Sequence, residues 1–223
     1  MTFSLVARCA RTGQFGMVIS SSSPAVAARC AHVRAGVGVV ASQNVTDPDL
    51  GALVLDQLAL GLPAAGALAA VVRDRAFIDY RQLLVVDAAG GRAIHSGQQV
   101  LGVWGEAQGM DCAAGGNLLA DAGVPAAMVA GFEAATGHLG DRLMAALQAG
   151  LGAGGEAGPV HSAGMKIADK LAWPLVDLRM DWHDAPIAAL AEAWAVYRPQ
   201  MAAYVQRAVD PRVAPSYGVP GDA

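Results

Sequence analysis

Residues 2–21, TFSLVARCARTGQFGMVISS, decide the fold expected of this chain. Apolar and polar side chains alternate imperfectly over residues 2–10, which is typical of a β-strand, and GMVISS at residues 16–21 indicates a second strand. The RTGQ sequence at residues 11–14 between them is typical of a turn. The chain is therefore predicted to open with a β-hairpin that has Thr2 at one strand end.

Beyond this hairpin, the sequence predicts strands that come singly or in pairs and helices that come mostly in pairs. Further strands are expected at residues 33–43, 82–87, 92–96, 110–114, 160–168 and 175–180. Helices are expected at residues 50–60, 63–73, 125–135, 139–149 and 186–208. Such an order suits an α+β fold of two mainly antiparallel sheets covered by helix layers, not a parallel Rossmann sheet.

A single domain over residues 1–209 accounts for all these elements, because no repeat or internal linker is visible. Residues 210–223 are rich in proline and glycine and are expected to form a flexible tail. The glycine-rich segment 150–158, GLGAGGEAG, lies inside the predicted fold. We interpret it as an active-site loop or a flexible rim.

The composition narrows the class of protein. A net charge of -4 and a pI near 5.6 offer no basic surface to nucleic acid. Hydrophobic residues make up 54% of the chain and charged residues 15%, which favours a large core and a buried homo-oligomer interface. No uncharged apolar run is long enough for a bilayer and no export signal precedes the first strand, so a cytoplasmic protein is expected. Neither the histidines nor the reduced cysteines have metal-ligand spacing, and neither a metal nor a cofactor is predicted.

Several short motifs, in a fixed order, carry a resemblance to a known family. They are TFSLVAR at 2–8, AGVGVVASQ at 35–43 with Pro48 and LG at 50–51, RQ at 81–82, VD at 86–87, HSG at 95–97, GNLLA at 116–120, and LRMD at 178–181 with His183 and Pro186. The series resembles the bacterial domain-of-unknown-function family 1028 (DUF1028). That resemblance implies an αββα sandwich of the N-terminal-nucleophile (Ntn) hydrolase type, and it implies little about the substrate.

Two residues depart from the family pattern near the end of the glycine-rich segment. His161 stands where the family has glutamine before Ser-Ala, and Lys166 stands where an aliphatic residue is expected. Their spacing in a strand turns them to opposite faces, so only one of them is expected near Thr2. We expect it to be His161, which lies nearer the strand end, whereas Lys166 is expected to be solvated or paired with an acid.

Thr2 is the candidate nucleophile. After removal of Met1, its hydroxyl could attack a carbonyl carbon while its own α-amine accepts the proton. The reference pKa of an α-amine is roughly 7.7–8.0, so a large share of it is neutral near working pH. The alternative is that Thr2 is an ordinary residue at a strand edge.

The other candidate site residues have polar side chains at predicted strand ends or turns. His95 and His161 are candidate general acids or bases. The candidates for substrate binding are Ser21, Gln43, Asn44, Asn117 and Arg81. Each has a structural alternative: local hydrogen bonds for the serine, turn capping for the amides, and an ion pair with Asp87 or Asp181 for Arg81 and Arg179. Thr2, Ser21, Gln43 and Asn117 are predicted to meet at one end of the sandwich.

Three functions fit these residues. The first is hydrolysis of a C–N bond in a small soluble metabolite, with Thr2 as nucleophile. The second is a cofactor-free deaminase acting on an enamine or imine such as a 2-aminomuconate-like acid, for which His95, His161, Lys166 and the arginines would matter more. The third is a non-catalytic protein that binds a small molecule on the same fold.

Overall fold

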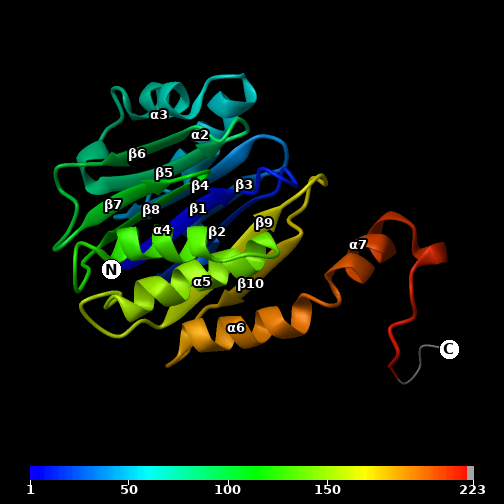
Figure 1. Cartoon of the computed structure of the whole chain (residues 1–223). Helices are drawn as coiled ribbons and strands as arrows, with labels where there is room; N and C mark the ends of the chain where they lie inside the picture. The colour runs from blue at the N-terminus through cyan, green and yellow to red at the C-terminus, as the bar shows by residue number, and fades with distance from the viewer. Residues whose placement is uncertain (220–223) are drawn as a thin grey trace.

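Two antiparallel sheets lie face to face between two layers of helices in the computed structural model, which describes residues 1–219 (Figure 1). The first sheet has six strands in the order β10-β9-β2-β1-β8-β7, and the second has four in the order β3-β4-β5-β6. The four-layer α+β sandwich expected from the sequence is confirmed. The opening hairpin forms the middle of the larger sheet, so Thr2 begins a central strand.

The strands of the first sheet are β1 (Thr2–Arg8), β2 (Phe15–Ser21), β7 (Gly105–Gly109), β8 (Cys112–Asn117), β9 (Ser162–Ala168) and β10 (Val176–Met180). Those of the second are β3 (Ala31–Arg34), β4 (Gly38–Asn44), β5 (Arg81–Asp87) and β6 (Arg92–Ser96). Every pairing is antiparallel, and the register sets Phe3 opposite Ser20 on one side of β1 and opposite Gly116 on the other.

Different helices cover the two outer faces. Helices α2 (Asp49–Ala59) and α3 (Ala64–Val72) pack on the second sheet. Helices α4 (Val124–Ala134), α5 (Leu139–Gly152) and α6 (Pro186–Tyr197) pack on the first, while the short α1 (Val26–Cys30) follows β2 and contacts both sheets. Helix α7 (Met201–Val209) extends away from the sandwich (Figure 1). No helix among residues 1–219 is long and apolar enough to cross a membrane.

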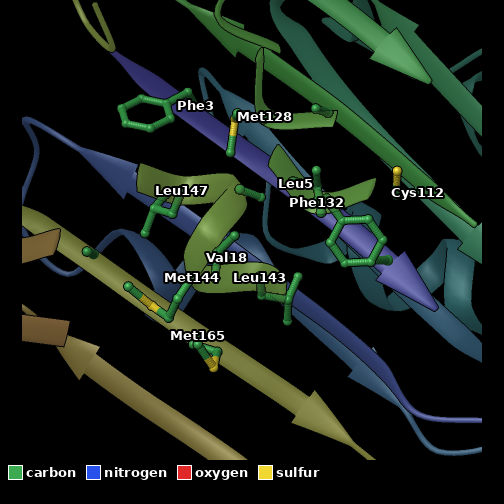
Figure 2. Packing of buried hydrophobic residues seen from close by; sticks show 14 of the residues in the cluster. Phe3, Leu5, Val18, Cys112, Met128, Phe132, Leu143, Met144, Leu147 and Met165 are labelled. Atoms are coloured by element: carbon green, nitrogen blue, oxygen red, sulfur yellow. The ribbon is translucent and has the colours of Figure 1, made fainter. Parts of the chain in front are cut away.

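The alternation of side chains along β1 decides which layer each of them enters. Phe3 and Leu5 point to the helices, and Figure 2 shows them packed with Met128 and Phe132 of α4 and with residues of α5. Val6 points the other way, into the core between the two sheets. Because strand side chains alternate with a period of two, Thr2 and Ser4 share the inter-sheet face with Val6. Thr2 is only 5% exposed there.

Two predicted elements were wrong in detail, and strand β7 was missed. The single strand expected at residues 33–43 is a hairpin, because Gly36 takes a φ of +70° and turns the chain between β3 and β4. Strand β7 was not predicted, since its sequence GEAQG lacks apolar alternation. The helix expected at residues 186–208 is divided into α6 and α7 around Pro199, whose ring and missing N–H interrupt a helix.

Both segments that the sequence predicts to be flexible contain residues with defined secondary structure or contacts. Within the predicted tail 210–223, residues Pro211–Val213 form a 3-10 turn, and the ring of Tyr217 lies 3.8 Å from the guanidinium carbon of Arg207; residues 220–223 lie outside the described part. In the segment 150–158, helix α5 continues to Gly152 and Glu156 forms an isolated β-bridge with Leu119. The glycine-rich segment is thus packed against the end of β8.

Candidate functional site

A row of four polar side chains crosses the first sheet at the end where β1 begins. The strand register pairs Thr2 with Asn117 of β8 and pairs Ser21 of β2 with Ser162 of β9, and Thr2 neighbours Ser21. All four are buried. Sequence reasoning had brought Thr2, Ser21 and Asn117 to one end of the sandwich, whereas Ser162 was not singled out.

Two hydroxyls of this row, those of Thr2 and Ser21, converge on the carbonyl of Met1. The Thr2 hydroxyl donates to the Met1 oxygen, and Thr2 Oγ1 also lies 3.5 Å from Ser21 Oγ. Ser21 Oγ donates to the same Met1 oxygen at 2.6 Å. Ser21 Oγ in turn accepts from the backbone N–H of Ser23 at 3.1 Å and lies 2.8 Å from Ser23 Oγ. One carbonyl oxygen therefore receives two hydroxyl donors, one of which belongs to the candidate nucleophile.

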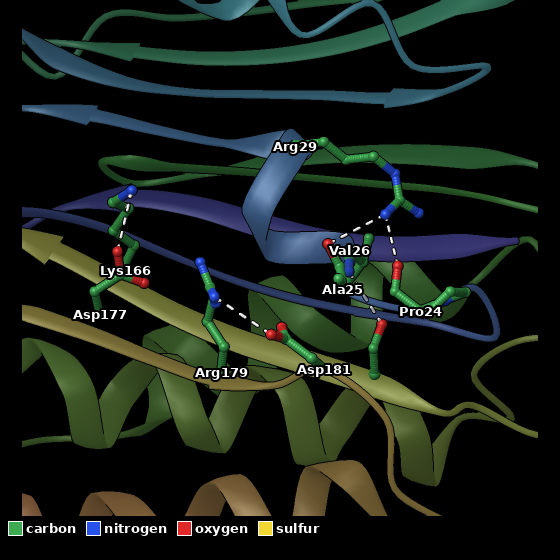
Figure 3. A network of polar contacts seen from close by, with 9 residues as sticks. Pro24, Ala25, Val26, Arg29, Lys166, Asp177, Arg179 and Asp181 are labelled. Carbon is green, nitrogen blue, oxygen red and sulfur yellow. Dashed lines mark hydrogen bonds and ion pairs between the residues drawn. The ribbon is translucent and has the colours of Figure 1, made fainter.

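The positively charged guanidinium of Arg29 is bonded to the far end of this hydrogen-bond chain. Arg29 Nη2 donates to Ser23 Oγ at 2.9 Å, and its Nη1 donates to the carbonyls of Pro24 at 2.6 Å and Ala25 at 3.1 Å (Figure 3). Because Ser21 Oγ gives its own proton to the Met1 oxygen, Ser23 Oγ is the donor in its contact with Ser21 Oγ. The arginine thus strengthens Ser21 as a donor toward the carbonyl oxygen.

A buried carboxylate adjoins the same strand end. Glu156 is 4% exposed, and both its oxygens accept the backbone N–H of Ser22 at 3.1 Å. Burial raises the pKa of the Glu156 carboxyl to about 7, although the positive α-amine of Met1 and the hydrogen bonds from Ser22 act to lower it. Sequence reasoning missed Glu156. The available signal was a lone acid inside a glycine-rich segment of a sparsely charged chain.

Asn117 presents unused hydrogen-bonding capacity next to Thr2. Its side chain is 1% exposed, and among the described residues neither its Oδ1 nor its Nδ2 has a hydrogen-bond partner. A buried amide left unpaired costs about 1–3 kcal/mol, so such groups are rare unless a ligand or water satisfies them. Asn117 is therefore available to bind a polar group placed beside Thr2.

His161 and Lys166 have very different surroundings. The backbone N–H of His161 donates to the Ser21 carbonyl at 2.8 Å, and its ring stacks on Trp182 with centroids 4.4 Å apart. Its Nδ1 is buried and makes no hydrogen bond within residues 1–219. Lys166 lies further along β9, where its Nζ pairs with Asp177 at 3.3 Å (Figure 3). The backbone of His161 is thus tied directly to the strand end that carries Ser21.

We expect His161→Gln to slow acylation of Thr2 about tenfold. Loss of a residue that itself transfers the proton would slow the reaction at least roughly 100-fold. Glutamine keeps the backbone hydrogen bond to the Ser21 carbonyl but removes the ring that stacks on Trp182 beside it. Lys166→Met serves as the matched variant and is expected to leave the rate unchanged, since a half-exposed ion pair contributes about 0–1 kcal/mol to stability alone. Rates are measured as the gain of a covalent adduct by mass spectrometry. A normal rate in His161→Gln beside a slow one in Lys166→Met would reverse the assignment.

Gln43 is occupied by contacts between the sheets. Ser4 Oγ donates to Gln43 Oε1 at 2.6 Å, while Gln43 Nε2 donates to Gln82 Oε1 at 2.9 Å and to the Gly115 carbonyl at 3.2 Å. All of its side-chain polar atoms are thus engaged. Gln43 lies at the same end of the sandwich as Thr2, where it contacts Ser4, two residues after Thr2 in β1. There its role is to link the two sheets.

The remaining candidates hold loops at the end of the second sheet. Asn44 Nδ2 donates to the Tyr80 carbonyl at 2.7 Å, Arg81 Nη1 donates to the Val45 carbonyl, and His95 Nε2 lies 3.3 Å from the Ile78 carbonyl. His95 pairs with Leu83, whose side chain belongs to the core under α2 and α3. It therefore points to the far face of the second sheet, and register separates it from Thr2.

Two further expectations about charged groups can be compared with the structure. Arg179 pairs with Asp181 at 3.3 Å, as predicted, whereas Arg81 forms no ion pair with Asp87 or Asp181 in the described chain. Residues 1–219 hold no group of three or more His, Cys, Asp or Glu side chains that could hold a metal.

Comparisons with known proteins bear on the whole chain. A protein-family model described as a family of unknown function (DUF1028) matches residues 2–190. A crystal structure of a DUF1028 protein from Silicibacter pomeroyi is 30% identical, with a TM-score of 0.86 over 92% of this chain and 90% of that one. A search of curated proteins found no match.

Two more distant solved structures share 12% identity with this chain. One is HslV from Trypanosoma brucei, with a TM-score of 0.48 over 75% of this chain and 99% of that one. The other is an Anbu mutant from Hyphomicrobium sp. strain MC1, with a TM-score of 0.45 over 90% of this chain and 96% of that one.

Proposed function

Since the chain belongs to the DUF1028 family, whose function is unknown, we propose its activity from its own site: hydrolysis of an amide-type C–N bond in a small metabolite. Thr2, freed by removal of Met1, is the nucleophile. The observation that carries this proposal is the contact of the Thr2 hydroxyl with a carbonyl oxygen that also accepts from Ser21. An acyl-transfer site needs such a nucleophile and oxyanion donor on one carbonyl.

The steps balance without a cofactor. Thr2 Oγ bonds to the substrate carbonyl carbon, and its proton passes to the α-amine of the same residue. The α-amine then gives that proton to the leaving nitrogen as the C–N bond breaks, which leaves an ester on Thr2. Water cleaves the ester, so that the carboxylic acid departs and the hydroxyl is restored. Ser21 and Asn117 donate hydrogen bonds to the carbonyl oxygen while it carries negative charge.

The amide hydrolase is preferred over the two other functions because of what adjoins Thr2. A deaminase built on His95, His161 and Lys166 would need the three in one cavity, and their contacts lie on different elements. A non-catalytic binding protein would not need a nucleophile buried beside a carbonyl. We also propose that the protein is cytoplasmic, forms a homo-oligomer and acts on a small molecule.

Covalent labelling tests the nucleophile before any substrate is known. The protein is produced as a fusion cleaved directly before Thr2. In a separate sample, periodate cleaves the 1,2-amino alcohol of a free terminal threonine to a glyoxylyl group, and the resulting loss of mass at the N-terminal peptide confirms the exposed amine. A β-lactone is then expected to add to Thr2, because its strained carbonyl acylates an activated hydroxyl without a leaving group. Peptide mapping locates the adduct.

The labelling has two matched variants. Thr2→Ala removes the hydroxyl and is expected to reduce labelling at least 100-fold, roughly the contribution of an activated nucleophile over a general background. Thr136→Ala removes an exposed threonine between α4 and α5 and should label normally. Equal labelling of Thr2→Ala, or none of the protein with a free Thr2, would rule out the proposed mechanism.

A further inference from the structure

The first residue of the chain lies where a substrate acyl group has to lie. Its carbonyl oxygen accepts from both Thr2 and Ser21, the two hydroxyls that the proposed reaction uses. Met1 therefore occupies the acyl subsite in the unprocessed chain, and removal of Met1 vacates it. The groups that surround the rest of Met1 then indicate which acyl group the vacated subsite accepts.

One of these groups is a buried carboxylate between the two segments that contact Met1. Both oxygens of Glu156 accept the backbone N–H of Ser22, the residue after Ser21, and Glu156 lies two residues before Gly158, which is beside the Met1 side chain. A carboxylate buried to this extent is rare unless it is paired with a positive charge. When Met1 leaves, its α-ammonium leaves with it, and Glu156 stays at the edge of the vacated space.

The other group is an apolar cavity lined by Gly158, the residue beside the Met1 side chain. A Cβ at Gly158 would lie 3.8 Å from the Met1 terminal methyl, so the thioether runs beside Gly158. Gly158 and Glu156 both line a cavity of about 330 Å³. Most of its other lining residues are apolar and come from the α5 end, the loop before β9 and the start of α6: Leu151, Pro159, Val160, Pro186, Ile187 and Ala188. Only Asp184 adds a second charge.

We propose that this subsite selects α-aminoacyl substrates: amides of an α-amino acid with a free ammonium group and an unbranched apolar side chain. Glu156 binds the ammonium, the cavity beside Gly158 takes the side chain, and the carbonyl rests between Thr2 and Ser21. The inference rests on the proposed function of Thr2, since it names the substrate class of that nucleophile. Glu156 is a specificity-determining residue in this scheme, because it touches the substrate but not the reacting atoms.

Binding of two boronic acids to the mature protein tests the subsite without a known substrate. The first probe is the boronic acid analogue of methionine, and the second is the same compound without its amino group. Both can form a reversible ester with Thr2 Oγ, and only the first carries the ammonium. By calorimetry, we expect the first to bind at least tenfold more tightly, as befits a charge-assisted hydrogen bond in a buried site.

Glu156→Gln is expected to reduce that ratio to near one while it leaves the affinity for the amine-free probe within twofold. Glu192→Gln makes the same change at an exposed position of α6 and should keep the full ratio. If wild-type protein binds both probes equally, or if Glu156→Gln weakens both equally, the subsite assignment is wrong although Thr2 still reacts. If wild-type protein binds neither probe and gains no lactone adduct, the proposed function itself fails.

Discussion

Gln43→Ala is expected to lower the free energy of unfolding by about 3–5 kcal/mol, because each buried polar group left without its partner costs about 1–3 kcal/mol. Gln43 is fully buried between the sheets, and its removal leaves three partners without their hydrogen bond: Ser4 Oγ, Gln82 Oε1 and the Gly115 carbonyl. A cavity the size of the lost amide adds to the loss. Urea unfolding followed by circular dichroism measures the change.

The matched variant is Gln148→Ala, which removes an exposed glutamine from α5. Alanine is the best helix former, so this change should stay within about 0.5 kcal/mol of wild type. A loss below 1 kcal/mol in Gln43→Ala would mean that water replaces the amide between the sheets. The network would then not be what joins the two sheets at this end.

Glu156→Gln is expected to stabilise the protein at pH 8 by about 3 kcal/mol and to have little effect at pH 4. Burial raises the pKa of this carboxyl from 4.5 in the unfolded chain to about 7 in the folded one. One pKa unit corresponds to about 1.4 kcal/mol. Because the folded state holds the proton more tightly, stability is highest below pH 4.5 and falls as the pH rises to about 7. Glutamine carries no charge and avoids that loss.

Thermal or urea unfolding at both pH values measures this prediction, with Glu192→Gln as the surface control. The control should change stability by less than about 0.5 kcal/mol at either pH. An equal effect of Glu156→Gln at pH 4 and pH 8 would show that its charge is not destabilising. A charge that lowers stability and yet stands beside the candidate nucleophile is typical of a residue kept for function.

Local patterns account for the elements that the sequence predicted well. The alternation of TFSLVAR and GMVISS, joined by a turn, defines the β1–β2 hairpin, and with it the neighbourhood of Thr2 and Ser21. Helices α2 to α5 follow from helical spacing that also has local signals, such as the His138–Asp141 capping box at the start of α5. These features depend on residues within a few positions of one another.

The tertiary structure alone decided which distant residues join Thr2. Glu156 lies 154 positions from Thr2 in the chain and reaches the site because its segment pairs with the end of β8. The same holds for Ser162, brought beside Ser21 by the register of β9, and for Gln82, bonded to Gln43 from the adjacent strand. His95 was turned away by a register that its own sequence does not reveal.

The sequence by itself therefore determined the opening hairpin and the order of strands and helices, since periodicity and turn chemistry are local properties. The class of sandwich and the choice of Thr2 as candidate nucleophile followed from the resemblance to the DUF1028 family. The acid, the unpaired amide and the tie between the sheets were decided by strand register and by burial. Register is set by how whole sheets pack, and a shift of one residue turns every side chain to the opposite face. For that reason Glu156, which most clearly defines the proposed acyl subsite, became recognisable only in the folded protein.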